Sequence, residues 1–129
     1  MTTKTPRQFF RPLAIGAPEP YRELPLRLER MIHFVPPHLD KVRAKVPQMA
    51  DQADVVLANL EDAIPADAKD AARDGAIEMG KMVDWQAKGT GFWSRVNPLN
   101  SPWFQEDVSR LVLEAGEQLD VIMLPKVEG

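Results

Sequence analysis

Residues 54–62 read Asp-Val-Val-Leu-Ala-Asn-Leu-Glu-Asp, a run of apolar, β-favouring residues that ends in two adjacent carboxylates. An apolar run followed by charged or polar residues recurs in residues 92–97, Phe-Trp-Ser-Arg-Val-Asn, and in residues 120–128, Asp-Val-Ile-Met-Leu-Pro-Lys-Val-Glu. A shorter apolar run, Met31–Val35, stops at two prolines. Short apolar runs with such boundaries are typical of buried strands. Charged residues at the carboxyl ends of parallel strands are typical of α/β barrel active sites, because the loops that follow the strands gather at that face.

Segments with helical spacing separate these strands. The expected strands are Met31–Val35, Asp54–Leu60, Phe92–Val96 and Asp120–Leu124, and the expected helices are His38–Ala53, Asp67–Val83 and Pro102–Ala115. Pro47 is expected to kink the first helix or to start a second one. In the second helix Asp67 is the expected N-cap and Gly75 a slight weakness. Gly116 is expected to end the third.

The alternation of strands and helices predicts an α/β fold. About four βα units correspond to the N-terminal half of a (β/α)8 TIM barrel, which needs about 250 residues when complete. Residues 30–129 are therefore expected to form a partial TIM-barrel domain, truncated after the fourth strand. Residues 1–29 are interrupted by five prolines. They are expected to form an extended arm against the domain or a neighbouring subunit, with a possible short helix around Tyr21–Glu29.

The composition excludes several classes of function. The 129 residues carry a formal net charge of −3, so no global basic field attracts nucleic acid. No window is long and apolar enough for a membrane span. The absence of cysteine excludes disulfides and thiolate metal sites, and it fits a cytoplasmic protein. The sequence also has neither a glycine-rich phosphate loop nor a nucleophile elbow.

The strand ends supply the candidate site. Glu61 and Asp62 can hold a divalent cation directly or through water, orient an arginine, or cap the next helix. Arg95 can bind a substrate carboxylate with its two-pronged guanidinium, pair with Glu61, or do both. Lys126 can support the carboxylates electrostatically, or form an ordinary surface pair with Glu128.

Other charged residues are less specific. Lys41, Arg43 and Lys45 form a basic cluster that can attract the phosphates of a nucleotide-bearing substrate, although such a run is more often a solvated helix face. His33 is more often a core histidine than a ligand, and two prolines separate it from His38, which disfavours a shared metal.

Three segments, residues 54–64, 95–103 and 120–128, resemble the signatures of the HpcH/HpaI aldolase and citrate lyase β-subunit superfamily, in the family's order and spacing. The proline-rich arm and residues 33–38, His-Phe-Val-Pro-Pro-His, are most similar to the malyl-CoA/β-methylmalyl-CoA lyases of that superfamily. The resemblance covers nearly the whole chain. It implies a (β/α)8 barrel, Mg²⁺ dependence, a homo-oligomer, and reversible carbon–carbon cleavage of a 3-hydroxyacyl-CoA thioester into glyoxylate and acetyl-CoA or propionyl-CoA.

The resemblance also implies roles for individual residues. Arg95 would bind the glyoxylate-derived oxygens, Glu61 would orient Arg95, and Asp62 would support the water shell of the metal. Phe34 and Val35 would line the thioester end of the pocket. Lys41 or Lys45 would face the CoA phosphates. The direct metal ligands and the catalytic acid/base would lie beyond residue 129. Asn59 stands where many relatives have Asp, which bears on metal affinity or on the orientation of Arg95.

Two other interpretations remain open. One is a non-enzymatic half-barrel that pairs with another half-barrel chain. The other is a lyase for citramalyl-CoA or for a free 2-keto-3-deoxy acid. On the main hypothesis, residues 1–129 alone are an inactive part of the enzyme.

Overall fold

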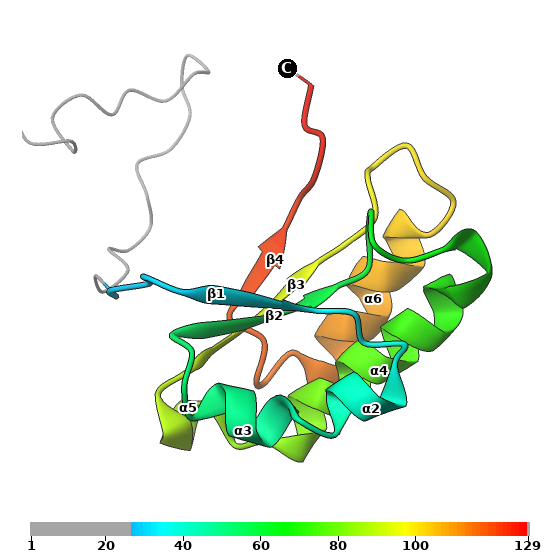
Figure 1. The fold of residues 1–129 in the computed structure, drawn as a ribbon. Helices are drawn as coiled ribbons and strands as arrows, with labels where there is room; N and C mark the ends of the chain where they lie inside the picture. Colours follow the sequence, from blue (N-terminus) through cyan, green and yellow to red (C-terminus); the bar gives the residue numbers. More distant parts are fainter. Residues whose placement is uncertain (1–26, 129) are drawn as a thin grey trace, which may run out of the picture.

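The computed structural model describes residues 27–128 of the 129-residue chain. Most of the expected arm, including residues 21–26 of its possible helix, lies outside the described residues. Residues 27–30 have no regular secondary structure. The described part is an α/β fold with one four-stranded sheet (Figure 1).

The four strands are parallel and follow one another across the sheet in chain order. They are β1 (Ile32–Val35), β2 (Val55–Asn59), β3 (Gly91–Arg95) and β4 (Val121–Met123). Three of them lie within the ranges that the sequence predicted, and β3 is shifted by one residue, because it begins at Gly91 and ends at Arg95. Apolar β-favouring runs of this kind fit a buried parallel sheet. This arrangement is compatible with part of a TIM-barrel fold.

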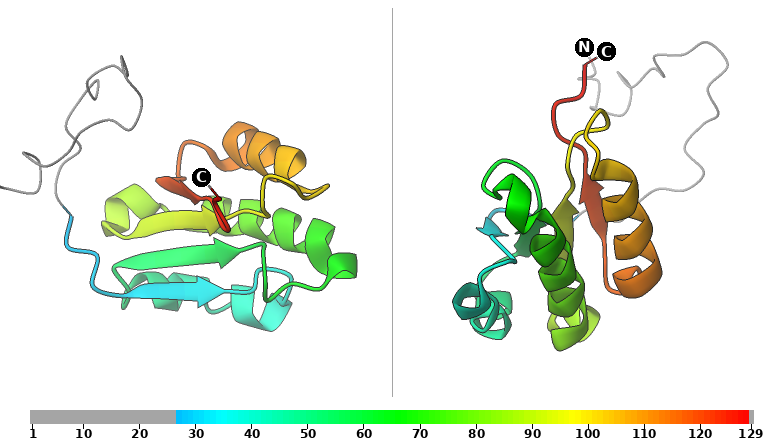
Figure 2. Two further views of the ribbon diagram at one scale, coloured as in Figure 1. Left: turned by 90° about the horizontal axis from the view of Figure 1, so that it is seen from above. Right: turned by 90° about the vertical axis from the view of Figure 1, so that its right-hand side faces the viewer.

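The helices form one layer on one side of the sheet (Figures 1 and 2). They are α2 (Asp40–Arg43), α3 (Val46–Ala50), α4 (Lys69–Met82), α5 (Trp85–Lys88) and α6 (Phe104–Ala115), with a 3-10 turn at Ala66–Ala68. Within residues 27–128, none of them has the length and apolar character that a membrane span requires.

One expected helix boundary is confirmed and another is not. Pro47 lies in the first turn of α3, so the stretch His38–Ala53 is two short helices, as the proline allowed. The expected N-cap at Asp67 is wrong. Asp67 belongs to the 3-10 turn, and α4 begins at Lys69 after Ala68, which makes no side-chain cap. The short α5 was not predicted; its cap is Asp84, whose carboxylate accepts a hydrogen bond from the Ala87 amide at 3.1 Å.

The two faces of the sheet have different surroundings. Side chains alternate along a strand, and Val35, Val56, Phe92 and Val96 point into the core beneath the helices. The opposite face carries a cross-strand row, Phe34, Leu57, Trp93 and Val121, given by the strand register. Seen from above, no described helix covers this row (Figure 2). We call it the open face.

Candidate active site

The carboxyl ends of β2, β3 and β4 bring together the charged residues that the sequence singled out. Glu61 follows β2, Arg95 ends β3, and Lys126 follows β4. Arg95 pairs with Asn59 in the ladder between β2 and β3, so the register places its side chain beside the end of β2. The parallel sheet is therefore what gathers residues that are far apart in sequence.

Arg95 is held on three sides. Its Nε donates a hydrogen bond to Asn59 Oδ1 at 3.0 Å, and its Nη2 lies 3.1 Å from Glu61 Oε2. The guanidinium carbon lies 5.6 Å from the centre of the Phe34 ring, within the range of a cation–π contact. Among the described residues, Nη1 donates no hydrogen bond. One donor edge of the fork thus remains available for a ligand.

Glu61 is the buried anion of the cluster, with 3% of its side chain exposed. Its Oε2 faces Arg95 and its Oε1 lies 2.7 Å from Lys126 Nζ. Its backbone amide donates to Asn59 Oδ1 at 3.1 Å. Asn59 therefore connects the main chain of Glu61 to the side chain of Arg95, and its amide oxygen does so without adding charge.

Lys126 bridges two carboxylates, because its Nζ also contacts Asp62 Oδ1 at 2.9 Å. This hydrogen bond holds the pKa of Asp62 below its ordinary value of 3.8. In turn Glu61, followed by Asp62, raises the pKa of Lys126 above 10.5. The part of the stability due to Asp62 is present above pH 3.8 and is lost as the pH falls through the lowered pKa. The part due to Lys126 is present below pH 10.5 and is lost as the pH rises through the raised pKa.

Comparison with known proteins places the chain in a family. The model of the HpcH/HpaI aldolase/citrate lyase family matches residues 30–129. The chain belongs to this family. It is 57% identical over 126 residues to a malyl-CoA/β-methylmalyl-CoA/citramalyl-CoA lyase of Chloroflexus aurantiacus, which covers 98% of this chain and 36% of the relative.

Two further relatives are more distant. An L-malyl-CoA/β-methylmalyl-CoA lyase of Rhodobacter capsulatus is 37% identical over 103 residues, 80% of this chain and 31% of its own. A citrate lyase subunit beta-like protein of Deinococcus radiodurans is 37% identical over 106 residues, 81% of this chain and 35% of its own. The chain thus spans about a third of the length of the curated relatives it matches.

The described residues do not by themselves fit a divalent cation, although the family resemblance implies one. Within residues 27–128, no three His, Cys, Asp or Glu side chains come together as a metal-binding group. The two neighbouring carboxylates, Glu61 and Asp62, both contact the ammonium of Lys126. The indirect role of Asp62 in the water shell of a metal stays a prediction.

The other predicted site residues lie in different surroundings. Phe34 is 47% exposed on the open face beside Arg95, whereas Val35 is fully buried on the helix side of the sheet. The structure therefore places Val35 in the core rather than at the cluster. Lys41 and Lys45 are exposed around α2. Arg43 is not part of a free basic patch, because it contacts Asp40 at 2.8 Å and Glu78 at 2.9 Å.

Sequence reasoning missed a second set of charges behind the strand ends. Lys69 donates to the carbonyl oxygens of Leu60 and Glu61. Asp107 accepts hydrogen bonds from the amide and side chain of Asn97 at 3.0 and 2.7 Å and pairs with Arg73 at 2.9 Å. These side chains occupy helical positions, where a charged residue is ordinarily solvated. No signal in the linear pattern would have found them.

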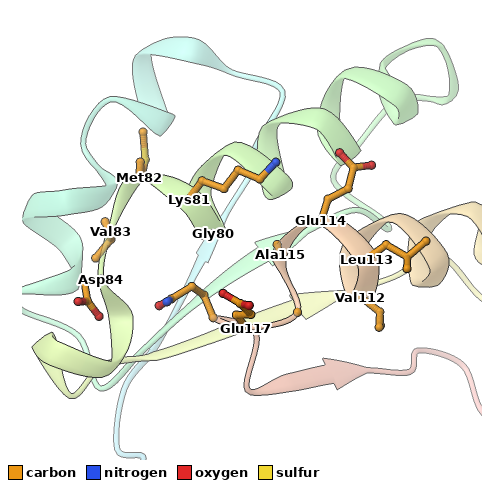
Figure 3. A pocket seen from close by; sticks show the side chains of 12 residues that line it. Gly80, Lys81, Met82, Val83, Asp84, Val112, Leu113, Glu114, Ala115 and Glu117 are labelled. Atoms are coloured by element: carbon orange, nitrogen blue, oxygen red, sulfur yellow. The ribbon is translucent and has the colours of Figure 1, made fainter.

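Cavities lie at both ends of the sheet. One of about 450 Å³ adjoins Lys126 and is lined by residues 98–100, 104 and 124–128. Another, of about 520 Å³, lies between the carboxyl ends of α4 and α6, lined among others by Met82, Val112 and Glu114 (Figure 3). Both helix ends precede a strand, so the second cavity is at the amino end of the sheet, away from the Arg95 cluster.

Proposed function

We propose that residues 1–129 are the substrate-orienting part of a Mg²⁺-dependent carbon–carbon lyase. The reaction is the reversible cleavage of L-malyl-CoA or β-methylmalyl-CoA to glyoxylate and acetyl-CoA or propionyl-CoA. On this proposal β1–β4 are the first four strands of a (β/α)8 barrel. The remaining strands, the direct metal ligands and the acid/base are contributed from outside these residues.

The observation that carries the proposal is the fixed guanidinium of Arg95 at the carboxyl end of a parallel sheet. Its Nε and Nη2 are bound to Asn59 and Glu61, and Nη1 is left for a ligand. A planar fork matches the oxygens of a 2-oxo acid, which a lysine ammonium cannot match. The malyl-CoA lyase names of the relatives support the same chemistry.

The chemistry requires charge to be held on oxygen. In cleavage, the hydroxyl of the malyl group loses its proton, its oxygen electrons form the carbonyl of glyoxylate, and the carbon–carbon bond breaks. The electron pair of that bond passes to the thioester fragment as an enolate, which is then protonated. Arg95 would bind the carboxylate and the carbonyl oxygen on the glyoxylate side and stabilise negative charge there. Glu61 and Phe34 would keep the guanidinium in that orientation, and Lys126 would offset the charge of Glu61.

The test compares Arg95→Lys with wild type in the full-length protein. Loss of a transition-state contact of this kind lowers kcat roughly 10²–10³-fold, so malyl-CoA-dependent release of glyoxylate should fall by that factor while thermal unfolding is unchanged. Arg110→Lys is the matched control, because Arg110 lies on α6 and pairs with Asp74 and Glu114 away from the cluster. Residues 1–129 alone should release no glyoxylate. Turnover by Arg95→Lys within a few-fold of wild type would show that Arg95 is only structural.

Citramalyl-CoA is the second candidate substrate, because the printed name of the Chloroflexus relative includes it. Parallel assays with malyl-CoA, citramalyl-CoA and a free 2-keto-3-deoxy acid separate these possibilities. A protein of full length that cleaves none of them would favour the non-enzymatic half-barrel.

A further inference from the structure

Lys69 is a buried cation directly behind the proposed site. It is the first residue of α4, and only 7% of it is exposed. Its Nζ donates to Leu60 O at 2.7 Å and to Glu61 O at 2.8 Å, and lies 5.4 Å from the centre of the Trp103 ring. Among the described residues, no carboxylate lies within ion-pair distance of it. Its hydrogen-bond partners are therefore backbone carbonyls.

The fold of α4 itself does not favour this residue. A helix amino terminus carries partial positive charge and stabilises acidic side chains rather than lysine. Burial also disfavours an ammonium and lowers the pKa of Lys69. The two carbonyls and the face of Trp103 offset these costs at close range, and the negative charges of Asp107, Glu61 and Asp62 favour the ammonium from further away.

Those carbonyls belong to the two residues that carry the chain from β2 to the carboxylate. The Leu60 amide donates to Arg95 O at 2.8 Å, and the Glu61 amide donates to Asn59 Oδ1 at 3.1 Å. Lys69 supplies the hydrogen bond to Leu60 O, and Glu61 O accepts one from Lys69 and one from the Ile64 amide at 3.0 Å. Every backbone polar group of Leu60 and Glu61 is thus hydrogen-bonded. The position from which the Glu61 side chain reaches Arg95 is thus fixed from the helix side as well as from the sheet.

We propose that Lys69 is a positioning residue, which holds the end of β2 so that Glu61 keeps Arg95 aligned for substrate. This inference rests on the proposed lyase function of the same site. Lys69 touches no substrate on this account and acts only through Glu61. Its removal should therefore affect turnover through Glu61, beyond any effect on folding.

The variant for the test is Lys69→Met in the full-length protein. Methionine keeps the unbranched side chain in its buried space and removes all donors. A small misplacement of a catalytic group can cost about 10²-fold in rate, so we expect kcat to fall roughly 10–10²-fold with KM for the thioester little changed. Lys81→Met, at an exposed position of the same helix, is the matched control and should behave as wild type.

A double-mutant cycle separates positioning from simple stabilisation. If Lys69 acts through Glu61, Lys69→Met should have little further effect on kcat in a Glu61→Gln background, because coupled residues are not additive. A purely structural lysine would cost the same factor in both backgrounds. An equal cost in both, or wild-type kcat for Lys69→Met, overturns the proposal.

Hydrogen–deuterium exchange tests the same proposal without activity. In Lys69→Met the amides of residues 59–64 should exchange faster than in wild type, and in Lys81→Met they should not. Unchanged exchange in Lys69→Met means that Lys69 does not hold this segment, whatever the enzyme assay gives. If wild type itself cleaves none of the thioesters, the proposed function fails, and the exchange result still decides whether Lys69 fixes the end of β2.

Discussion

Gly75 is a residue whose missing side chain matters to the whole helix layer. A Cβ at this position of α4 would lie 2.1 Å from the carbonyl oxygen of Pro37 and 2.8 Å from its carbonyl carbon. Contacts that short do not occur between unbonded atoms, and here the other atoms are backbone. The close approach lets the turn after β1 pack on α4, so the glycine is a packing requirement rather than the slight weakness that the sequence indicated.

Gly75→Ala is therefore expected to destabilise the protein. Alanine for glycine inside a helix ordinarily gains about 0.5–1 kcal/mol, but overpacking of this kind costs about 1–3 kcal/mol. The free energy of unfolding in urea should fall accordingly. The control is Ala71→Gly at an exposed position of α4. This variant should lower the free energy of unfolding by about 1 kcal/mol, because glycine has a lower helix propensity than alanine. A more stable Gly75→Ala protein would contradict the contact with Pro37.

Which functional residues could be predicted from the sequence depended on where they lie, because charged residues at strand ends were identified and buried charged residues on helices were not. Arg95, Glu61 and Lys126 were identified because polar residues at the end of an apolar run are conspicuous, and the structure brings them together. Lys69 and Asp107 were not, because in a helical pattern a charged residue is ordinarily assigned to the solvated face. The burial of both is decided by how α4 and α6 pack, which the linear pattern does not contain.

Between elements, a buried ion pair joins α4 to α6 behind the end of β3. Arg73 on α4 is 1% exposed and Asp107 on α6 is 0% exposed, with Nε and Oδ1 2.9 Å apart. The second carboxylate oxygen of Asp107 holds Asn97, two residues beyond Arg95. The pair thus fixes the loop after β3 in the way that Lys69 fixes the end of β2.

Asp107→Ala is expected to lower the free energy of unfolding by about 3–5 kcal/mol, because it leaves the guanidinium of Arg73 buried without its main partner. Asp107→Asn keeps an acceptor for the Asn97 amide, so its free energy of unfolding should fall by less. Both variants are measured by urea unfolding, with Gln105→Ala as the exposed control on the same helix. Arg73 Nη1 also lies 2.9 Å from Asp70 and 3.6 Å from Glu106. Losses below about 1 kcal/mol for Asp107→Ala would mean that these two carboxylates are enough to compensate the buried charge.

The elements themselves were largely predictable, for a physical reason. Strand and helix in this chain differ in apolar spacing, and prolines or glycines stand near most boundaries, as Pro47 and Gly116 do. The exceptions are local. The start of α4 was placed at Asp67 because aspartate is a good cap, but the 3-10 turn at Ala66–Ala68 takes that position. The four residues of α5 are too few to show a period.

For the described molecule as a whole, the sheet has helices on one side only. The open face carries Phe34 and Val121, which are 47% and 37% exposed. Between them in the register lie Leu57, which is 0% exposed, and the half-buried Trp93. Parallel sheets ordinarily have both faces covered. In the proposed barrel, the side chains of further strands would fill this side.

Residues 1–129 in isolation are therefore expected to associate and to bind the apolar dye ANS. Burial of apolar surface is worth about 25 cal/mol per Å², so leaving several hundred Å² exposed forfeits several kcal/mol, comparable to the whole stability of a small domain. The outer strands β1 and β4 also present unpaired backbone groups to a second copy. Light scattering at low micromolar concentration measures the association, and ANS fluorescence measures the exposed apolar surface.

Two variants test which surface causes the association and the ANS binding. Phe34→Gln on the open face should reduce ANS binding and association, whereas Leu113→Gln, which is 84% exposed on the outer side of α6, should reduce them much less. If Leu113→Gln has the larger effect, the helix layer rather than the sheet is the adhesive surface. A monodisperse, cooperatively melting monomer that binds no ANS would show that the open face is closed within residues 1–129, and the half-barrel interpretation would then be wrong.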